Sequence, residues 1–501
     1  MSLSTHTLIY ARFHCWMSKC VFPTTGSYSP PHLFSSLWPS FPFPFPLLYR
    51  TQNDDFTRFH SKESGTVLDD ASAFGDISRI AIDNDTSRIH LSPTNDGAAV
   101  MDMDAIDYTA LHRKDIRVAA RQLLQDARLS GRSTTPATRT NSLAVLLSTD
   151  SQVLKLPMEQ VPSPLRKKST IGENPIIVGG NKGRILQELG RGAFGTVVLL
   201  EGPPDEPPVA VKVQAPLECL AWEFTVLKRL QSRLCGSTAS TTKETGAFPF
   251  PRSISYVALA DGGLMGMSPA SFSGLNLVDI VNVYRAQENG PVPELIALHY
   301  TIRMLRHVEL LHWHGQILHC DIKPDNWVMA PSSTAFEGCS QEIPASDLVL
   351  VDFGRAVDME AAAGNTTEPM NVRLYGEAVD QDMACVAIRN GWSWSFDIDT
   401  YGICASAHVL LYGSHLEIER DTTTKVWRPK KALRRYWQRE LWTNLFNSLL
   451  NVDEVSRRAM GSRPGNLRSI RTTMEEYVNS RTKELESMLR HQGRMLPEKK
   501  K

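Results

Sequence analysis

Three glycines between two strand-like runs are the feature that most constrains the fold of this chain. Gly190, Gly192 and Gly195 form a GxGxxG pattern, in which backbone amides can approach phosphate oxygens because no side chain stands in the way. In a dinucleotide-binding fold the third glycine would open a helix. Here the chain continues with the apolar run 197–200 and soon reaches two adjacent prolines. The pattern therefore predicts a strand–loop–strand flap that folds over a nucleotide.

The strand-like run after this loop places a lysine beside the same nucleotide. Side chains of a strand alternate between the two faces of a sheet, so Ala210 and Lys212 share one face. The small side chain at 210 leaves space for a purine, and the ammonium of Lys212 can reach the phosphates. Val197, two residues after the third glycine, is assigned to the same nucleotide site.

A glutamate on the next helical stretch is the expected partner of this lysine. Glu223 follows Lys212 by eleven residues and has Val226, Leu227 and Leu230 at helical spacing behind it. A helix with this spacing turns the carboxylate inward, where it can pair with Lys212 and hold it extended. The alternative is a solvated surface ion pair, which would contribute less than about 1 kcal/mol.

Two motifs further along the chain are more specific. Residues 319–326 read HCDIKPDN and residues 348–354 read LVLVDFG. In this order, behind the glycine loop and the VAVK strand, they resemble the catalytic loop and the metal-binding motif of protein kinases. The resemblance implies an α+β, bilobal protein kinase fold, in which a small β-rich N-lobe precedes a large, mainly helical C-lobe.

The residue types in these motifs fit phosphoryl transfer, which requires the protein to position groups and neutralise charge. Asp352 and Asn326 offer hard oxygen ligands for Mg²⁺, which bridges the phosphates of ATP. Asp321 would accept or orient the proton of the substrate hydroxyl. Lys323 can reach the transferring phosphate, a pattern that resembles serine/threonine rather than tyrosine kinases. We therefore assign catalytic roles to Asp321, Lys323 and Lys212, with ATP and Mg²⁺ as cofactors.

Other residues around the catalytic loop have structural interpretations. Five histidines, at positions 299, 307, 312, 314 and 319, lie in or near the helix that precedes the loop. A metal site is one interpretation, but their spacing does not converge, and His319 resembles a packing residue of kinases. Asp399 resembles the buried aspartate that anchors the backbone of the catalytic loop in kinases.

Several short segments of the chain narrow the kind of kinase. They are Val211–Pro216 with Ala221–Phe224, Asp321–Asn326, Asp358–Met359, Cys385–Val386, Trp394 five residues before Asp399, and Trp442–Asn451. These features resemble one kinase family, the budding-uninhibited-by-benzimidazoles (Bub) mitotic checkpoint kinases. The resemblance covers residues from about 180 to 485 and implies a serine/threonine kinase of the spindle assembly checkpoint at kinetochores, with a histone tail as substrate.

The chain departs from the common kinase pattern at two positions. Cys320 replaces the arginine that precedes the catalytic aspartate, so the usual clamp on an activation-segment phosphate is absent. This absence argues against switching by that route, and the Bub family also lacks that arginine. Ala387 stands where an acidic residue normally closes the activation segment, which leaves open how that segment is anchored.

The composition changes along the chain and suggests its domains. Residues 1–175 are rich in Pro, Ser, Thr, Asp and Asn, and we expect them to be mostly disordered apart from one helix at about 115–129. The alternating Phe-Pro stretch at 41–46 is either a polyproline-type docking segment or an unstructured leader. We expect a kinase domain at 176–485, with an N-lobe at about 176–264 and a C-lobe at about 275–485, and a charged tail at 486–501.

Charge and cysteine content limit the partners. Lys plus Arg and Asp plus Glu both number 54, so no global field attracts nucleic acid or a membrane. The eight cysteines lack the spacing of a disulfide scaffold or a zinc site, which favours a reducing, intracellular compartment. The expected location is the nucleus at the kinetochore or centromere, by resemblance, with the cytoplasm as a further option. The expected partners are a protein substrate and checkpoint or kinetochore proteins.

The basic stretch at 428–439 and the kinase motifs each leave two interpretations open. The basic stretch Arg428–Arg439 either meets an acidic nucleosome surface or is a solvated face. The leading function is an active serine/threonine kinase, and the alternative is a pseudokinase scaffold of the same family. All the ionisable residues that catalysis requires are present, and retaining such charges without a function would cost desolvation free energy.

Overall fold

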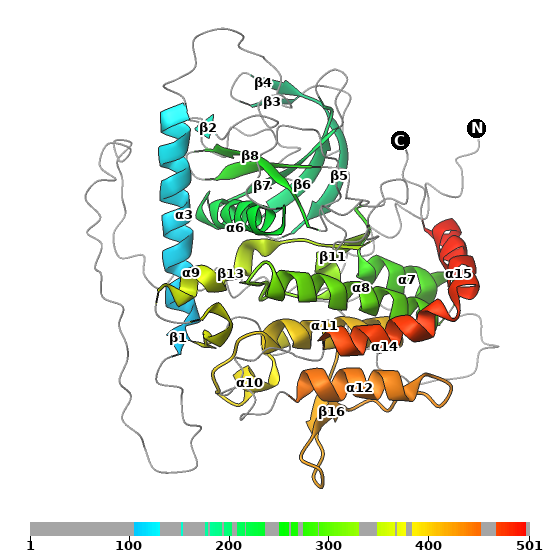
Figure 1. Ribbon diagram of the computed structural model, residues 1–501. Coiled ribbons are helices and arrows are strands. Elements are labelled where there is room, and N and C mark those ends of the chain that lie inside the picture. Colours follow the sequence, from blue (N-terminus) through cyan, green and yellow to red (C-terminus); the bar gives the residue numbers. More distant parts are fainter. Residues whose placement is uncertain are drawn as a thin grey trace, which may run out of the picture. The chain divides into compact units, whose positions relative to one another are not determined.

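The computed structural model describes residues 105–130, 152–153, 176–178, 181–192, 195–202, 208–215, 217–235, 250–259, 262–268, 274–288, 290–329, 348–365, 368–376, 383–451 and 467–496. Within this part of the chain, a lobe built on a β-sheet precedes a larger helical lobe (Figure 1). The α+β, two-lobed architecture that the sequence predicts is therefore confirmed.

The small lobe is a six-stranded sheet with one helix packed on it. Its strand order is β2-β8-β9-β7-β6-β5, and all neighbours are antiparallel except β2 and β8, which are parallel. The three strands expected around the glycine loop all form. The bounds are β2 Gln152–Val153, β5 Ile185–Arg191, β6 Gly195–Leu200, β7 Val209–Gln214, β8 Ser253–Ala258 and β9 Gly263–Met267, with helix α6 at Leu217–Cys235 and a separate hairpin of β3 (Ile176–Val178) and β4 (Asn181–Gly183).

The large lobe is built around two buried helices. Helix α11 (Asp397–Tyr412) is buried at nearly every position, and helix α8 (Glu294–Trp313) packs against it. A helix that is buried on all sides forms the centre of a core rather than its surface. Around this pair lie α7 (Leu277–Gln287), α12 (Arg439–Leu450), α14 (Leu467–Asn479) and α15 (Thr482–Met495). None of the described helices has the length and apolar composition to cross a membrane.

Short elements between these helices carry the loops of the site. Three two-stranded sheets pair β10 with β13, β11 with β12, and β15 with β16. Their bounds, with those of the remaining short elements, are β10 Ile317–Leu318, η3 Pro324–Asn326, β11 Trp327–Met329, β12 Leu348–Leu350, η5 Phe353–Arg355, β13 Val357–Asp358, α9 Met359–Ala363, η6 Pro369–Asn371, β14 Leu374–Tyr375, α10 Val386–Arg389, β15 Ile418–Arg420 and β16 Trp427–Pro429.

The C-terminal helix differs from the tail expected at 486–501. Helix α15 continues to Met495, and its side chains Gln492 and Met495 are buried. The Gln492 amide donates to the Tyr300 hydroxyl at 2.6 Å, and the Gln287 amide donates to the Met495 carbonyl at 2.9 Å. Residues 486–495 therefore belong to the packed large lobe, because apolar and amide groups spaced along one helix face meet α7 and α8.

The expected helix of the N-terminal region is longer than predicted and packs on the kinase-like lobes. Helix α3 spans Tyr108–Ser130 and lies beside α6 (Figure 1). The preceding strand β1 (Ile106–Asp107) pairs with β14. The buried face of α3 includes Ala119 and Leu123, whereas Val118 is exposed. Residues 105–130 are thus an ordered exception to the disorder expected at 1–175, and the Phe-Pro stretch at 41–46 lies outside the described residues.

Two titratable side chains of α3 are buried against the lobes. Burial raises the pKa of the Asp115 carboxyl to about 6, although the Arg229 guanidinium opposes the shift. Burial also lowers the pKa of His112 to about 4. Burial therefore disfavours the charged form of each group in the folded protein relative to the unfolded chain.

We predict that Asp115→Asn stabilises the protein at neutral pH. The folded state raises the pKa of this carboxyl, so Asp115 does not destabilise the folded protein below about pH 4, where it is protonated in both states. The loss of folding free energy grows as the pH rises from about 4 through 6. Asparagine carries no charge, so the free energy of unfolding should rise by about 1–2 kcal/mol at pH 7, after allowance for the partial exposure of this side chain. Urea unfolding at several pH values measures this change.

The two α3 groups act in opposite directions over the same pH range. His112 has a lowered pKa, so it destabilises the folded state as the pH falls from 6.5 toward 4. In the wild type the two slopes oppose each other, and in Asp115→Asn the slope of His112 alone should appear. An Asp115→Asn protein with the wild-type stability at pH 7 and the wild-type pH profile would contradict the burial argument.

Candidate active site

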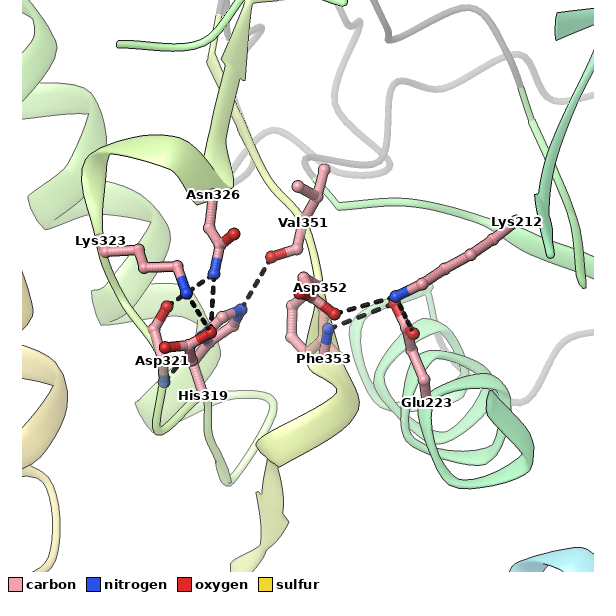
Figure 2. Close-up of polar contacts among 9 residues, drawn as sticks. All are labelled: Lys212, Glu223, His319, Asp321, Lys323, Asn326, Val351, Asp352 and Phe353. Carbon is pink, nitrogen blue, oxygen red and sulfur yellow. Dashed lines mark hydrogen bonds and ion pairs between the residues drawn. The ribbon is translucent and has the colours of Figure 1, made fainter. Parts of the chain in front are cut away.

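Lys212 on β7 lies at the centre of the site. Its ammonium is 2.6 Å from Glu223 Oε2 and 2.9 Å from Asp352 Oδ1 (Figure 2). Burial alone would lower the pKa of Lys212, but the carboxylates of Asp352 and Glu223 outweigh it and raise that pKa. The lysine is therefore a permanent cation held between two carboxylates from different elements.

The pairing of β6 with β7 puts the other nucleotide-site residues on one side of the sheet. Val197 is the direct cross-strand partner of Lys212, and side chains of such partners lie on the same face. Ala210, two residues before Lys212, shares that face and is fully buried. The three residues assigned to the nucleotide from sequence are therefore neighbours on the sheet.

The three glycines of the loop have different surroundings. A Cβ at Gly195 would lie 2.6 Å from the Val213 carbonyl oxygen, so the close approach of β6 and β7 requires glycine there. Among the described residues, and apart from each glycine's own chain neighbours, no atom lies within 4 Å of a Cβ built at Gly190 or Gly192. The latter two glycines thus leave open space beside the backbone, which a phosphate-binding loop requires.

Glu223 reaches Lys212 because α6 turns it inward. Its side chain is only 3% exposed, and the apolar residues of the same helix face, Val226, Leu227 and Leu230, are fully buried. Besides Lys212, Glu223 accepts a hydrogen bond from the Phe353 amide at 3.3 Å. The spacing argument made from sequence therefore describes the helix correctly, and the solvated alternative for this ion pair is wrong.

Asp352 stands in an unusual backbone conformation. Its φ of 69° and ψ of 71° lie in the left-handed region, which costs a residue with a Cβ about 1–2 kcal/mol. Lys212 holds the pKa of the Asp352 carboxyl well below its usual range. The Asp352 side chain is 47% exposed, so this charged oxygen donor is accessible to a ligand.

A second group of polar residues comes from the loop after β10. The Lys323 ammonium donates to Asp321 Oδ2 at 2.9 Å, and the Asn326 amide donates to the Asp321 carbonyl at 2.8 Å. Figure 2 shows the amide oxygen of Asn326 turned away from Asp321. Burial opposes the charge of Lys323, but Asp321 outweighs it and raises the pKa of that ammonium. The loop therefore presents a carboxylate, a cation and an amide oxygen together.

His319 connects the two groups. Its Nε2 contacts the Val351 carbonyl at 3.1 Å, next to Asp352, and its Nδ1 accepts from the Asp321 amide at 3.2 Å. These partners require a proton on Nε2 and a free Nδ1. Burial lowers the pKa of His319, which matches this neutral tautomer. The His319 ring packs against Phe353, with centroids 4.8 Å apart, which agrees with the packing role expected from sequence, and its two ring nitrogens also link the two loops.

Asp399 on α11 anchors the backbone of the loop that carries Asp321. Its carboxylate accepts from the backbone amides of His319 and Cys320 at 2.8 Å each and from His312 Nε2 at 2.9 Å. Cys320 has a φ of 60°, so this carboxylate holds a strained backbone in place. The expected anchoring role of Asp399 agrees with these contacts.

The donor set suits a hard cation that a nucleotide helps to bind. Asp352 supplies a carboxylate and Asn326 an amide oxygen, and Mg²⁺ is typically held by one or two carboxylates together with substrate phosphates. Within the described ranges, no group of three or more His, Cys, Asp or Glu side chains is placed to hold a metal alone. The histidines at 307 and 312 instead contact the carbonyl of Arg303 and the carboxylate of Asp399.

The activation segment is anchored without an acidic residue at Ala387. Trp394 exchanges two backbone hydrogen bonds with Leu374, and its indole donates to the Gly376 carbonyl at 2.9 Å. Arg389 donates to the Ala384 carbonyl at 2.7 Å and to the Tyr401 hydroxyl at 2.9 Å. These contacts answer the question that the alanine leaves open in the sequence.

Sequence reasoning missed the contacts of α3 with the site. The Tyr108 hydroxyl donates to the carbonyl of Arg355, directly after the DFG motif, at 3.1 Å. The Tyr108 ring stacks on His112 and lies against Trp394, with centroids 5.3 Å apart in both pairs. His112 in turn meets the edge of Trp222, the neighbour of Glu223. No sequence signal in the N-terminal region indicates this docking, because a short amphipathic pattern does not name its partner.

Comparison with known proteins gives the chain its relatives. No protein-family model matches it. It is 30% identical over 318 residues to the mitotic checkpoint serine/threonine-protein kinase BUB1 of Arabidopsis thaliana, covering 61% of this chain and 56% of that protein. It is 27% identical over 304 residues to the spindle assembly checkpoint serine/threonine-protein kinase BUB1 of Saccharomyces cerevisiae, covering 58% of this chain and 28% of that protein. The matched region thus spans about half of the plant relative and less of the yeast one.

A solved structure shares the fold. The crystal structure of the BubR1 kinase domain matches with a TM-score of 0.56 at 23% identity, covering 75% of this chain and 98% of that one. At this identity the match supports the fold alone. The chain thus has a bilobal protein kinase fold, and its similarity to the curated relatives supports a Bub1-like protein kinase.

Proposed function

We propose that the chain is an ATP-dependent serine/threonine protein kinase that transfers the γ-phosphate of ATP to a protein hydroxyl. The observation that carries this proposal is the position of Lys212, bonded at once to Glu223 on α6 and to Asp352 after β12. A kinase requires this lysine and the metal-binding aspartate in place together. The names of the curated relatives support the same activity.

Each residue has a distinct part in the proposed reaction. Lys212 binds phosphate oxygens of ATP, and Glu223 keeps it extended. Asp352 and Asn326 hold Mg²⁺, which when bound neutralises charge on the phosphates. Asp321 accepts the proton of the attacking hydroxyl, and Lys323, 2.9 Å from Asp321, stabilises the charge on the transferring phosphoryl group.

The wider role follows from the relatives by analogy. We propose that the chain acts in spindle checkpoint signalling at the kinetochore, with a nuclear location, a histone tail as substrate and checkpoint proteins as partners. The names of the two curated relatives support the checkpoint role. Concentration of the protein at centromeres in dividing cells tests it, and an even distribution through mitosis would contradict it.

We predict that transfer of labelled phosphate from ATP to histones depends on three residues. Asp321→Asn removes the base and should lower the rate by about 10²- to 10⁴-fold. Asp352→Ala should abolish transfer with Mg²⁺, and Lys212→Met should weaken Mg²⁺-dependent nucleotide binding. Asp421→Asn, which changes an aspartate in the turn between β15 and β16, is the matched control and should keep the wild-type rate.

The outcomes separate the proposal from its alternative. Transfer that persists in Asp321→Asn and Asp352→Ala would refute these assignments. A wild-type protein that binds nucleotide but transfers no phosphate to histones or to itself would instead support the pseudokinase scaffold.

We also predict that Tyr108→Phe lowers turnover while the ring packing against Trp394 is kept. The substitution removes the hydrogen bond that the hydroxyl donates to the Arg355 carbonyl, and the loss of one such bond costs about 0.5–1.5 kcal/mol. If this loss falls on the active position of residues 352–355, turnover at saturating ATP should drop about fivefold or more.

The exposed Tyr436, 69% accessible, supplies the control variant Tyr436→Phe, which should behave as wild type. Steady-state turnover and a urea unfolding curve are measured for both variants. Unchanged turnover in Tyr108→Phe would contradict the coupling between α3 and the site.

A further inference from the structure

A buried carboxylate just after the DFG motif binds two arginines of α6. Asp358, at the end of β13, is 0% exposed. It accepts from Arg229 Nη1 at 2.7 Å and from Arg233 Nη2 at 2.8 Å. It also accepts from the Ala361 amide at 3.2 Å and so caps α9. We call Arg229, Arg233 and Asp358 the α6 clasp.

The α6 clasp fixes the helix that carries Glu223. Arg229 and Arg233 lie six and ten residues after Glu223, about two and three turns along α6. Near Glu223, the Trp222 indole donates to the Ala356 carbonyl at 2.9 Å. The helix is therefore tied at both ends to residues 353–358, and it cannot turn or slide without breaking charged hydrogen bonds.

In other kinases a phosphate on the activation segment supplies this kind of order by pairing with arginines. Here the residue before the catalytic Asp321 is Cys320, which is buried, and burial raises the pKa of its thiol far above the usual range. The Cys320 thiol is therefore uncharged and cannot pair with a phosphate as an arginine does. The two α6 arginines already bind the carboxylate of Asp358, which is part of the amino-acid sequence and is not added by a modification.

We propose that Asp358 is a positioning residue whose buried carboxylate replaces an activating phosphate, so that α6 holds Glu223 on Lys212 without phosphorylation of the activation segment. The proposal rests on the proposed kinase activity and names how that activity is regulated. The proposal can be tested with few substitutions, because Thr366, Thr367 and Tyr375 are the only residues with a hydroxyl group between 355 and 391 and so the only candidate phosphorylation sites there.

The first experiment removes phosphate rather than the carboxylate. The full chain is treated with a phosphatase, and a variant that combines Thr366→Ala, Thr367→Ala and Tyr375→Phe is prepared. Both should keep turnover within about twofold of the untreated wild type. A loss of tenfold or more in either would overturn the proposal, since it would show that a phosphate is needed.

The second experiment removes the charge. Asp358→Asn should lower kcat at least tenfold and raise KM for ATP. Glu360→Gln is the matched control, because Glu360 also contacts Arg233, at 2.7 Å, but is 58% exposed. It should keep turnover within about twofold. Equal turnover in Asp358→Asn and Glu360→Gln would overturn the proposal.

A mutant cycle separates positioning from mere destabilisation. Glu223→Gln should lower kcat strongly in the wild-type background but change it less than threefold in the Asp358→Asn background, because α6 then no longer delivers Glu223 to Lys212. Equal losses in the two backgrounds would refute the coupling. If Asp358→Asn fails to fold, Arg229→Gln, at a side chain that is 40% exposed, takes its place in the same cycle.

Failure of the kinase proposal gives a different result. If the wild type transfers no phosphate, titration with a fluorescent ADP analogue and Mg²⁺ compares wild type, Asp358→Asn and Glu360→Gln. Weaker binding in Asp358→Asn alone would support the role of the α6 clasp in a nucleotide-binding pseudokinase. Equal affinities in the three proteins would overturn it.

Discussion

The rest of the structure depends on one buried cation between two carboxylates. Lys212 contacts Glu223 at 2.6 Å and Asp352 at 2.9 Å, and these three residues come from a strand, a helix and the turn after another strand. Taking such charges out of water is costly, and the cost is offset only when all the partners are in place. Loss of Lys212 would leave two carboxylates without their counter-ion, and loss of either carboxylate would leave Lys212 with one of its two partners. The ion pairs therefore form only when the sheet, α6 and residues 351–355 are all in place together.

Contacts from distant parts of the chain hold these elements in place. Trp222 ties α6 to the Ala356 carbonyl, and Tyr108 of α3 binds the Arg355 carbonyl from the opposite end of the sequence. Both are hydrogen bonds to backbone carbonyls next to the DFG motif, so they fix the path of the chain rather than one side chain. The catalytic loop is anchored separately, through the Asp399 carboxylate on α11. The segment after the DFG motif and the loop that carries Asp321 are thus held by separate contacts from different elements.

The sequence allowed the polar centre to be predicted because each part of it is local. The GxGxxG pattern, the alternation around Lys212 and the helical spacing behind Glu223 each involve a few neighbouring residues, and all three appear in the structure. The extent of α3, its docking through Tyr108 and the packing of α15 through Gln492 depend on contacts between residues more than 150 positions apart. Periodicity shows that a helix has an apolar face but not what that face meets. Val118 illustrates the limit, since it is an apolar residue of α3 and is nevertheless 51% exposed.

Backbone strain at the site explains why so many supports are present. Cys320 and Asp352 both have positive φ values, of 60° and 69°, and each such residue costs about 1–2 kcal/mol relative to an ordinary conformation. The strain at Cys320 is balanced by the two amide hydrogen bonds to Asp399, and the strain at Asp352 by its ion pair with Lys212. Each charged hydrogen bond contributes about 1.5–3 kcal/mol, so these contacts offset the strain as long as their partners stay in place. The buried carboxylate of Asp358 joins α6 to the segment after the DFG motif, and it thereby keeps together two elements that carry partners of Lys212.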